Sequence, residues 1–247
     1  MLTEREQERY HRQILLFGEE GQDLLKEAHL FIAGAGGLGS PVSLYLAAAG
    51  VGMLTIVDHD MVERTNLNRQ ILHRDRDLGR PKVDSAQDTL REINPDITVR
   101  GINATIQADN VADLVGKADG IVDAVDNFTV RYLLNEVAFA KGIPLFHGAI
   151  QGFYGQAATI VPPDTACLRC MFPHPPPGEP APVIGVTPGI IGTIQATEAI
   201  KYLLGCGELL TNRLFIWDGF RTRAEEIRVQ KNASCAVCCR SMGEKEA

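Results

Sequence analysis

A glycine-rich turn between two apolar segments constrains the fold of this chain more than any other feature. Residues 29–33 are short and apolar, which is typical of a buried strand, and they lead into Gly34-Ala35-Gly36-Gly37-Leu38-Gly39. The Ala-rich residues 38–49 predict a buried helix, and residues 53–57 predict a second strand that ends at Asp58. Strand, turn, helix and strand in this order form the βαβ unit of an α/β protein.

The rest of the chain continues to alternate between helix and strand patterns. A helix is predicted over residues 3–27, and the last two strands are expected to pair antiparallel. The apolar residues of that first helix that we expect to pack against the core are Ile14, Leu15, Leu24 and Leu25. Further helices are predicted over 81–93, 129–141 and 192–204, and further strands over 98–102, 120–124, 144–147, 156–161, 214–218 and 224–229. These patterns predict a Rossmann-like mixed sheet with helices on both faces.

Composition argues against two classes of partner. The formal net charge of -7 disfavours nonspecific binding to nucleic acid, which usually needs a basic surface. No apolar run approaches the roughly 20 residues of a membrane span. Residues 1–12 are charged and lack the apolar core of a signal peptide, so we expect a cytoplasmic protein.

Seven prolines between residues 173 and 188 predict a surface loop, and the tail from residue 243 is expected to be disordered.

The glycine turn is suited to a nucleotide. Gly34, Gly36 and Gly39 would allow a tight turn and a close approach of backbone N–H groups to a phosphate, at the N-terminus of a helix. A carboxylate at Asp58 would accept hydrogen bonds from ribose hydroxyls. This pattern alone favours NAD over ATP, and a purely structural tight turn is the alternative.

A basic segment after Asp58 favours ATP instead. Arg69 in Thr65-Asn66-Leu67-Asn68-Arg69-Gln70, and Lys82 after Pro81, carry donors without acceptors and suit several phosphate oxygens. A triphosphate benefits from such extra cations, above all when charge moves to leaving pyrophosphate. Either cation taken alone also fits a solvated basic face.

Four of the six cysteines form two Cys-x-x-Cys pairs, Cys167 with Cys170 and Cys235 with Cys238. Two such pairs can supply four thiolates in a tetrahedron around zinc, whereas one pair alone would also fit a redox motif. We therefore expect a closed structural zinc site, with Cys239 as a free thiol. Cys206, at the end of a predicted helix, is expected to be a small buried residue.

Seven motifs together resemble one family, the ThiF/MoeB/HesA proteins, which are bacterial relatives of ubiquitin-activating enzymes. The resemblance covers residues 4 to about 239. The motifs are Tyr10-x-Arg12-Gln13-Ile14, Gly34-x-Gly36-Gly37-Leu38-Gly39, Gly50-Val51-Gly52, Asp58, Asn66-Leu67-Asn68-Arg69-Gln70, Pro81-Lys82 and Asp126-Asn127.

The resemblance implies an activity and a domain plan. Members use ATP and Mg²⁺ to adenylate the C-terminal glycine of a small ubiquitin-like sulfur carrier protein that ends in Gly-Gly. It implies one adenylation domain over residues 1–247, with a nucleotide-binding half at about 1–150. A crossover loop, the zinc site and the C-terminal strands would occupy about 151–240. The carrier and its pathway, whether thiamin, molybdopterin, cysteine or tungsten cofactor, stay open.

The same resemblance implies roles for individual residues. Asp126 would position Mg²⁺, although a helix N-cap is the alternative for this residue. Arg12 resembles an arginine that reaches the ATP site of a neighbouring subunit, which implies a homodimer. The residues expected to contact the nucleotide are Gly37, Asp58, Thr65, Asn66, Arg69, Lys82, Asp126 and Asn127. Those expected to act in catalysis are Arg12, Arg69, Lys82 and Asp126.

One departure from the family sets a limit on the expected chemistry. Many members carry a cysteine in the crossover loop, but residues 171–191 contain none. We expect the reaction to stop at the acyl-adenylate and leave sulfur delivery to another protein. Two other hypotheses remain, an NAD-dependent oxidoreductase and a non-catalytic nucleotide-binding scaffold. His147, at the end of a predicted strand, is expected to be hydrogen-bonded in place, and a functional position near the site is the alternative.

Overall fold

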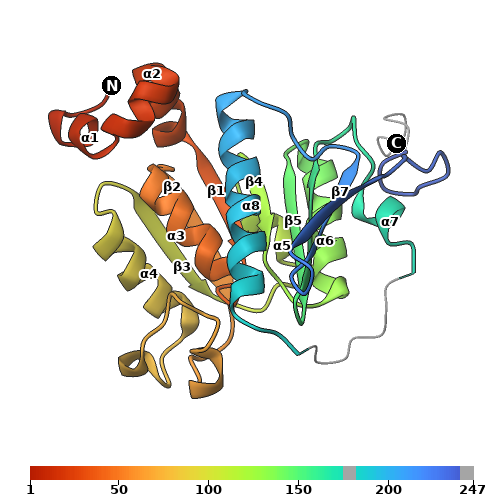
Figure 1. Ribbon diagram of the computed structural model, residues 1–247, viewed down its shortest axis with the longest axis horizontal. Helices are drawn as coiled ribbons and strands as arrows, with labels where there is room; N and C mark the ends of the chain where they lie inside the picture. Colours follow the sequence, from red (N-terminus) through yellow and green to blue (C-terminus); the bar gives the residue numbers. More distant parts are fainter. Residues whose placement is uncertain (175–181, 240–247) are drawn as a thin grey trace.

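The computed structural model describes residues 1–174 and 182–239, and its centre is one mixed sheet (Figure 1). The strand order is β3-β2-β1-β4-β5-β6-β7-β8. Neighbouring strands from β3 to β5 run parallel, and the pairs from β5 to β8 run antiparallel, as predicted for the last two strands. The strands are β1 (His29–Ala33), β2 (Met53–Asp58), β3 (Thr98–Asn103), β4 (Gly120–Asp123), β5 (Leu145–Gln151), β6 (Tyr154–Ile160), β7 (Arg213–Asp218) and β8 (Arg223–Arg228).

Helices cover both faces of this sheet, which confirms the predicted α/β architecture. They are α1 (Glu4–Arg9), α2 (His11–Glu27), α3 (Gly39–Ala49), α4 (Lys82–Ile93), α5 (Val111–Val115), α6 (Phe128–Lys141), α7 (Leu168–Met171) and α8 (Val186–Leu204). Two short 3₁₀ turns, η1 (Arg64–Asn66) and η2 (Asp75–Asp77), lie between β2 and α4. The helices α5 and α7 were not predicted, because four or five residues are too few to show a helical period.

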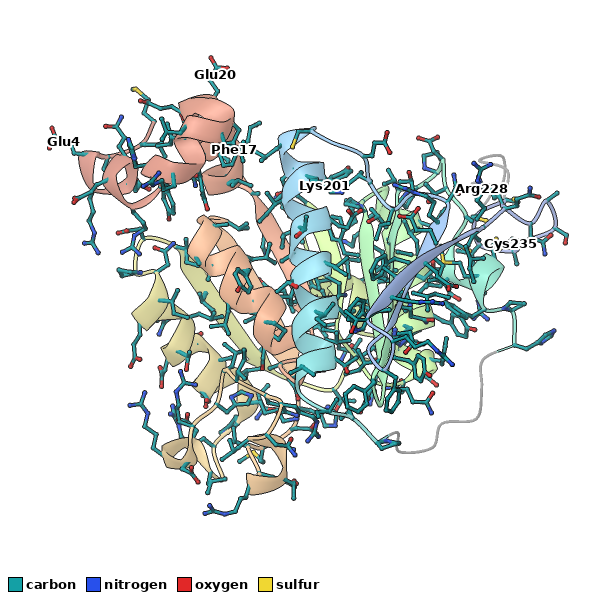
Figure 2. All side chains as sticks on the ribbon, viewed as in Figure 1. Glu4, Phe17, Glu20, Lys201, Arg228 and Cys235 are labelled. Carbon is teal, nitrogen blue, oxygen red and sulfur yellow. The ribbon has the colours of Figure 1, made fainter. Side chains whose placement is uncertain are left out.

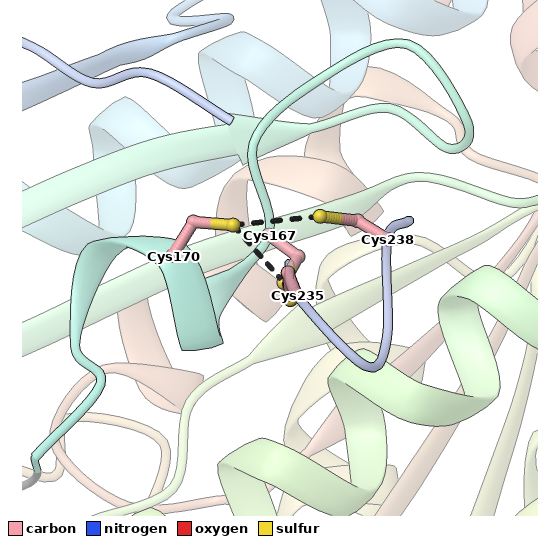
Figure 3. A group of neighbouring side chains, drawn as sticks. All are labelled: Cys167, Cys170, Cys235 and Cys238. Carbon is pink, nitrogen blue, oxygen red and sulfur yellow. Dashed lines mark hydrogen bonds between the residues drawn. The ribbon is translucent and has the colours of Figure 1, made fainter. Parts of the chain in front are cut away.

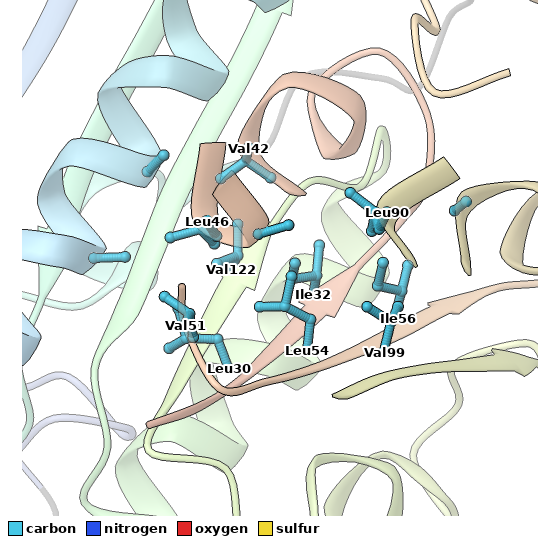
Figure 4. Packing of buried hydrophobic residues seen from close by; sticks show 14 of the residues in the cluster. Leu30, Ile32, Val42, Leu46, Val51, Leu54, Ile56, Leu90, Val99 and Val122 are labelled. Atoms are coloured by element: carbon cyan, nitrogen blue, oxygen red, sulfur yellow. The ribbon is translucent and has the colours of Figure 1, made fainter. Parts of the chain in front are cut away.

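The core forms because successive residues of the parallel strands point to opposite faces. Leu30 and Ile32 of β1 pack with α3, α4 and α8 on one face, as seen in Figure 4. Phe31 and Ala33 pack with α5 and α6 on the other. Apolar side chains therefore cover β1 on both faces of the sheet, as is usual for strands of a parallel sheet. Each large aliphatic side chain buried in this way contributes about 1.5–3 kcal/mol to stability.

The prediction of one continuous helix over residues 3–27 is wrong. The first helix ends at Arg9 with Tyr10 as its C-cap, and the second is kinked at Gly18, whose φ of 74° lies in the left-handed region. Leu15 and Leu24, which we expected in the core, are 68% and 50% exposed, while Leu25 is fully buried. These helices, which carry the labelled Glu4, Phe17 and Glu20, lie far from Cys235 in Figure 2.

Two other boundaries differ clearly from the predictions. Helix α8 begins at Val186, six residues before the expected start, because a proline such as Pro188 fits within the first turn of a helix. The strand predicted over 144–147 extends to Gln151, since it pairs with β6. Residues 175–181 of the proline-rich loop and the tail from 243 lie outside the described residues. Among the described helices, none is long and apolar enough to cross a membrane.

Candidate nucleotide site and cysteine cluster

The sheet order places three functional loops at one edge. Strand β1 lies between β2 and β4, and Ala33 is in register with both Val57 and Asp123, near the carboxyl ends of all three strands. The loops that follow these strands carry the glycine turn, Asp58 and Asp126. In open α/β sheets, a ligand binds in the crevice outside the carboxyl ends of the strands where the strand order reverses. The topology therefore brings the main predicted nucleotide contacts to one place.

The turn requires glycine at two positions, because a side chain at either position would collide with the backbone. Gly34 has a φ of 101°, and a Cβ on it would lie 2.6 Å from the carbonyl oxygen of Ala124. A Cβ on Gly39 would lie 2.0 Å from the Gly34 carbonyl oxygen. Helix α3 can therefore start directly behind the turn, with its first N–H groups at the sheet edge, where they suit an anion.

Asp58 is held against this turn. Its Oδ2 accepts a hydrogen bond from the Ala35 N–H at 2.8 Å, and its Oδ1 accepts one from the Asp60 N–H at 2.8 Å. A carboxylate has about four lone-pair positions, so two acceptor positions remain. The structure therefore brings Asp58 to the place that a ribose-binding carboxylate would need.

Lys82 lies beside Asp60 in a small pocket. It is only 5% exposed, and its Nζ donates to Oδ2 of Asp60 at 2.8 Å. Burial opposes ionisation of Asp60, but the Lys82 ammonium outweighs it and lowers the pKa of this carboxyl below its ordinary value. An ammonium has three donors, so others remain for a ligand. The pocket measures about 300 Å³ and is lined by His59, Asp60, Met61, Glu63, Asn66 and Lys82.

Arg69 and its neighbours form the second part of the basic segment, and their side chains are held by local hydrogen bonds. Arg69 Nη1 donates to the Thr65 carbonyl at 2.7 Å, which holds the side chain back on its own turn. Asn66 is buried, and its Oδ1 accepts from the Glu63 N–H at 3.1 Å. The start of α8 packs here too, because a Cβ on Gly185 would lie 2.5 Å from the Asn68 carbonyl oxygen. Sequence reasoning missed this contact.

Asp126, in the loop after β4, does not cap the helix that follows it. Asn127 is the N-cap of α6, since its Oδ1 accepts from the Val130 N–H at 2.9 Å. The alternative of an N-cap at Asp126 is therefore wrong. The Asp126 carboxylate is exposed, and its one side-chain contact in the described part of the chain is the Asn127 amide at 3.4 Å.

Arg12 is not brought to this site within one chain. Its neighbour Gln13 donates to the carbonyl of Ala49 at 3.0 Å, at the C-terminal end of α3. The glycine turn lies at the other end of this helix, which spans about 16 Å at 1.5 Å per residue. Arg12 itself is exposed.

A buried polar network behind the Asp126 loop was also missed. Asp123 and His147 are fully buried, and His147 Nδ1 lies 2.7 Å from Asp123 Oδ2. The expectation that His147 is hydrogen-bonded in place is thus confirmed, and burial lowers its pKa. Arg131, on the first turns of α6, completes the network. A charged residue on the same helix face as the buried Leu134 and Ala138 was the available sequence signal.

The four cysteines of the two pairs meet in one cluster, shown in Figure 3. Their sulfur atoms lie 3.9 Å apart for Cys167 and Cys170, 3.5 Å for Cys167 and Cys235, and 3.4 Å for Cys170 and Cys238. A tetrahedron with zinc–sulfur bonds of about 2.3 Å has edges of about 3.8 Å, so the donor set fits one metal ion. The prediction that Cys206 is buried is wrong: it follows the left-handed cap Gly205 and is exposed.

Comparisons with known proteins agree with this arrangement. The ThiF family matches residues 10–237. The chain is 47% identical to the SAMP-activating enzyme E1 of Haloferax volcanii, over 94% of this chain and 88% of the relative. It is 41% identical to the sulfur carrier protein adenylyltransferase of Thermus thermophilus, over 96% of this chain and 92% of the relative.

Solved structures share the fold. E. coli MccB, in a crystal structure with ATP, superposes with a TM-score of 0.85 at 24% identity, over 93% of this chain and 74% of that chain. PaaA superposes with a TM-score of 0.82 at 27% identity, over 94% and 76%. The family match and the two adenylyltransferase-type relatives together show that this chain is an adenylyltransferase and belongs to the ThiF family.

Proposed function

We propose that this chain uses ATP and Mg²⁺ to adenylate the C-terminal glycine carboxylate of a small ubiquitin-like sulfur carrier protein ending in Gly-Gly. The observation that carries the proposal is the meeting of the glycine turn, Asp58, Lys82 and the exposed carboxylate of Asp126 at one sheet edge. An NAD site would use the turn and Asp58, but it has no need of the buried cation or of Asp126. Relatives named for SAMP and for a sulfur carrier protein support a small protein as the second substrate.

The residues at this edge fit the demands of acyl-adenylate formation. The carrier carboxylate is already ionised, so it can attack the α-phosphorus without a general base while pyrophosphate leaves. The protein must hold two anions together and screen their repulsion. Lys82 and Arg69 would supply positive charge to the phosphates, and the N–H groups at the start of α3 would supply donors.

The site also fits the metal that the family uses. Asp126 offers an exposed carboxylate, the hard oxygen ligand that Mg²⁺ prefers, and it spends neither oxygen on a helix cap. When bound, the ion would neutralise phosphate charge. Zn²⁺ is proposed at the other metal site, held by Cys167, Cys170, Cys235 and Cys238. Its role is structural, because four thiolates leave no open position.

The proposal is tested by exchange of labelled pyrophosphate into ATP. We expect exchange with a Gly-Gly-ended carrier and none without it, because only the carrier carboxylate forms the adenylate. Tight NAD binding without exchange would instead support an oxidoreductase. Nucleotide binding with neither activity would support a scaffold.

Arg12 is proposed to complete the site of a second copy in a homodimer. The proposal rests on its exposure and on its place at the far end of α3 from its own glycine turn. We expect Arg12→Ala and Asp126→Ala each to be inactive alone. Co-expressed in equal amounts, they should recover about a quarter of the wild-type exchange rate, because half of the dimers are mixed and each of these has one intact site. Absence of any recovery in a mixed dimer would contradict a shared site.

A further inference from the structure

The backbone that carries Asp126 is held from behind by a single guanidinium. Arg131 is buried, and its Nη2 donates to the carbonyl of Val125, the residue before Asp126, at 2.6 Å. Its Nη1 donates to the Gly148 carbonyl at 2.7 Å and to Oδ2 of Asp123 at 3.1 Å. The loop is therefore tied to the end of β4 and to the middle of β5 through one planar group.

The charge of that guanidinium is balanced inside the network. His147 Nδ1 lies 2.7 Å from Asp123 Oδ2 and 3.0 Å from Arg131 Nη1, and because a carboxylate can only accept, the short contact with Asp123 assigns the proton to Nδ1. Burial lowers the pKa of His147, which keeps the ring neutral. Gln195 donates from α8 to the carbonyls of Asp123 and Phe146 at 2.8 Å each. Each charged group thus has partners, as a buried ion pair requires.

The same loop is anchored on its other side by the glycine turn. The Ala124 N–H donates to the Ala33 carbonyl at 3.0 Å, and the Ala124 carbonyl lies where a side chain on Gly34 would be. Ala124 is thus fixed against the phosphate-binding turn, and Val125 is fixed by Arg131. Asp126 projects from the next residue, so these two anchors set its position relative to the turn.

We infer that Arg131 is a positioning residue, which acts through the Val125 carbonyl to hold Asp126 where Mg²⁺ bound with ATP needs it. The inference rests on the proposed function of Asp126. A purely structural ion pair with Asp123 is the competing account. Replacing a buried pair with apolar residues often leaves stability unchanged or higher, so a stability measurement alone does not decide between the two accounts. The two accounts differ in what they predict for metal dependence.

The test is Arg131→Lys, with ATP binding measured by calorimetry at increasing Mg²⁺ concentration. Lysine keeps the charge beside Asp123, but its single nitrogen cannot hold the carbonyls of Val125 and Gly148 as the planar fork does. We expect the Mg²⁺ concentration for half-maximal ATP affinity to rise about tenfold, which corresponds to one charge-assisted hydrogen bond. ATP affinity in the presence of a chelator should be unchanged. In an Asp126→Asn background, Arg131→Lys should add nothing, because the two residues act in series.

A matched control separates positioning from general destabilisation. Glu198 on α8 is also buried and charged, and it accepts from the Leu210 N–H at 2.6 Å, away from the Asp126 loop. Glu198→Gln should lower the melting temperature without shifting the Mg²⁺ dependence. An unshifted Mg²⁺ dependence in Arg131→Lys, an equal shift in Glu198→Gln, or a further effect in the Asp126→Asn background would each overturn the inference.

Two further measurements cover the cases in which the first variant does not fold or the proposed function fails. If Arg131→Lys does not fold, Asp123→Asn preserves the shape of the network and removes the charge that orients Arg131, and we expect a shift of about threefold in the same direction. If the wild-type protein binds ATP with Mg²⁺ but no carrier supports exchange, the proposed function fails. The binding titrations would still decide the role of Arg131.

Discussion

Asp126→Ala is expected to lower carrier-dependent exchange of pyrophosphate into ATP by about 10²–10³-fold, the range measured when one group that stabilises transition-state charge is removed. The melting temperature should stay within about 1 °C of the wild type, because Asp126 is exposed and Asn127 caps α6 in its place. A large loss of activity without a loss of stability is typical of a site residue. Exchange kinetics and thermal melts on the same preparations measure both effects.

Asp113→Ala supplies the matched control for this variant. Asp113 is an exposed aspartate in the first turn of α5, which packs on the same face of the sheet as α6. Its removal changes the net charge by the same amount, and it should leave the exchange rate unaltered. Exchange at the wild-type rate in Asp126→Ala would show that the magnesium assignment is wrong.

Loss of zinc is expected to produce the largest change in stability. The segment after β8 is largely exposed, so few apolar contacts hold it, and the cysteine cluster joins it to α7. We expect one zinc per chain by elemental analysis. Cys238→Ser should abolish that zinc and lower the melting temperature by about 10 °C, since each kcal/mol lost costs about 2–4 °C in a chain of this size.

The two remaining cysteines test the choice of ligands. Cys239 lies 4.0 Å from the Cys238 sulfur but donates to the Asn232 carbonyl at 3.1 Å, and Cys206 is exposed elsewhere. Cys239→Ser and Cys206→Ser should both retain one zinc and the wild-type melting temperature. Protein purified without chelators that contains no zinc, or a melting temperature insensitive to Cys238→Ser, would rule out a structural metal.

The sequence predicted the parts of the molecule that local patterns determine. The apolar runs of β1 and β2 and the glycines between them specify the βαβ unit, because each strand is buried on both faces and the turn excludes side chains. The four clustered cysteines were predicted from their spacing alone, because two Cys-x-x-Cys pairs can supply the four thiolates of one zinc site. The antiparallel pairing of β7 with β8 followed from their short connection.

What the sequence did not show depends on contacts between distant segments. The network of Asp123, Arg131 and His147 joins β4, α6 and β5, and no spacing rule connects an aspartate to an arginine eight residues on and a histidine sixteen residues beyond that. The kink at Gly18 was missed because a glycine inside an apparent helical pattern is tolerated in many helices. The prediction that Leu15 and Leu24 pack against the core is also wrong, because both are exposed.

The central claim is tested most directly by looking for the product on the carrier. The protein is incubated with a Gly-Gly-ended carrier, ATP, Mg²⁺ and inorganic pyrophosphatase. The mass of the intact carrier is then measured by mass spectrometry. A matched carrier with an amidated C-terminus lacks the reacting carboxylate. We predict an AMP group on the C-terminal glycine of the first carrier and none on the amidated one. Failure to adenylate the free carboxylate, or equal modification of both carriers, would contradict the account.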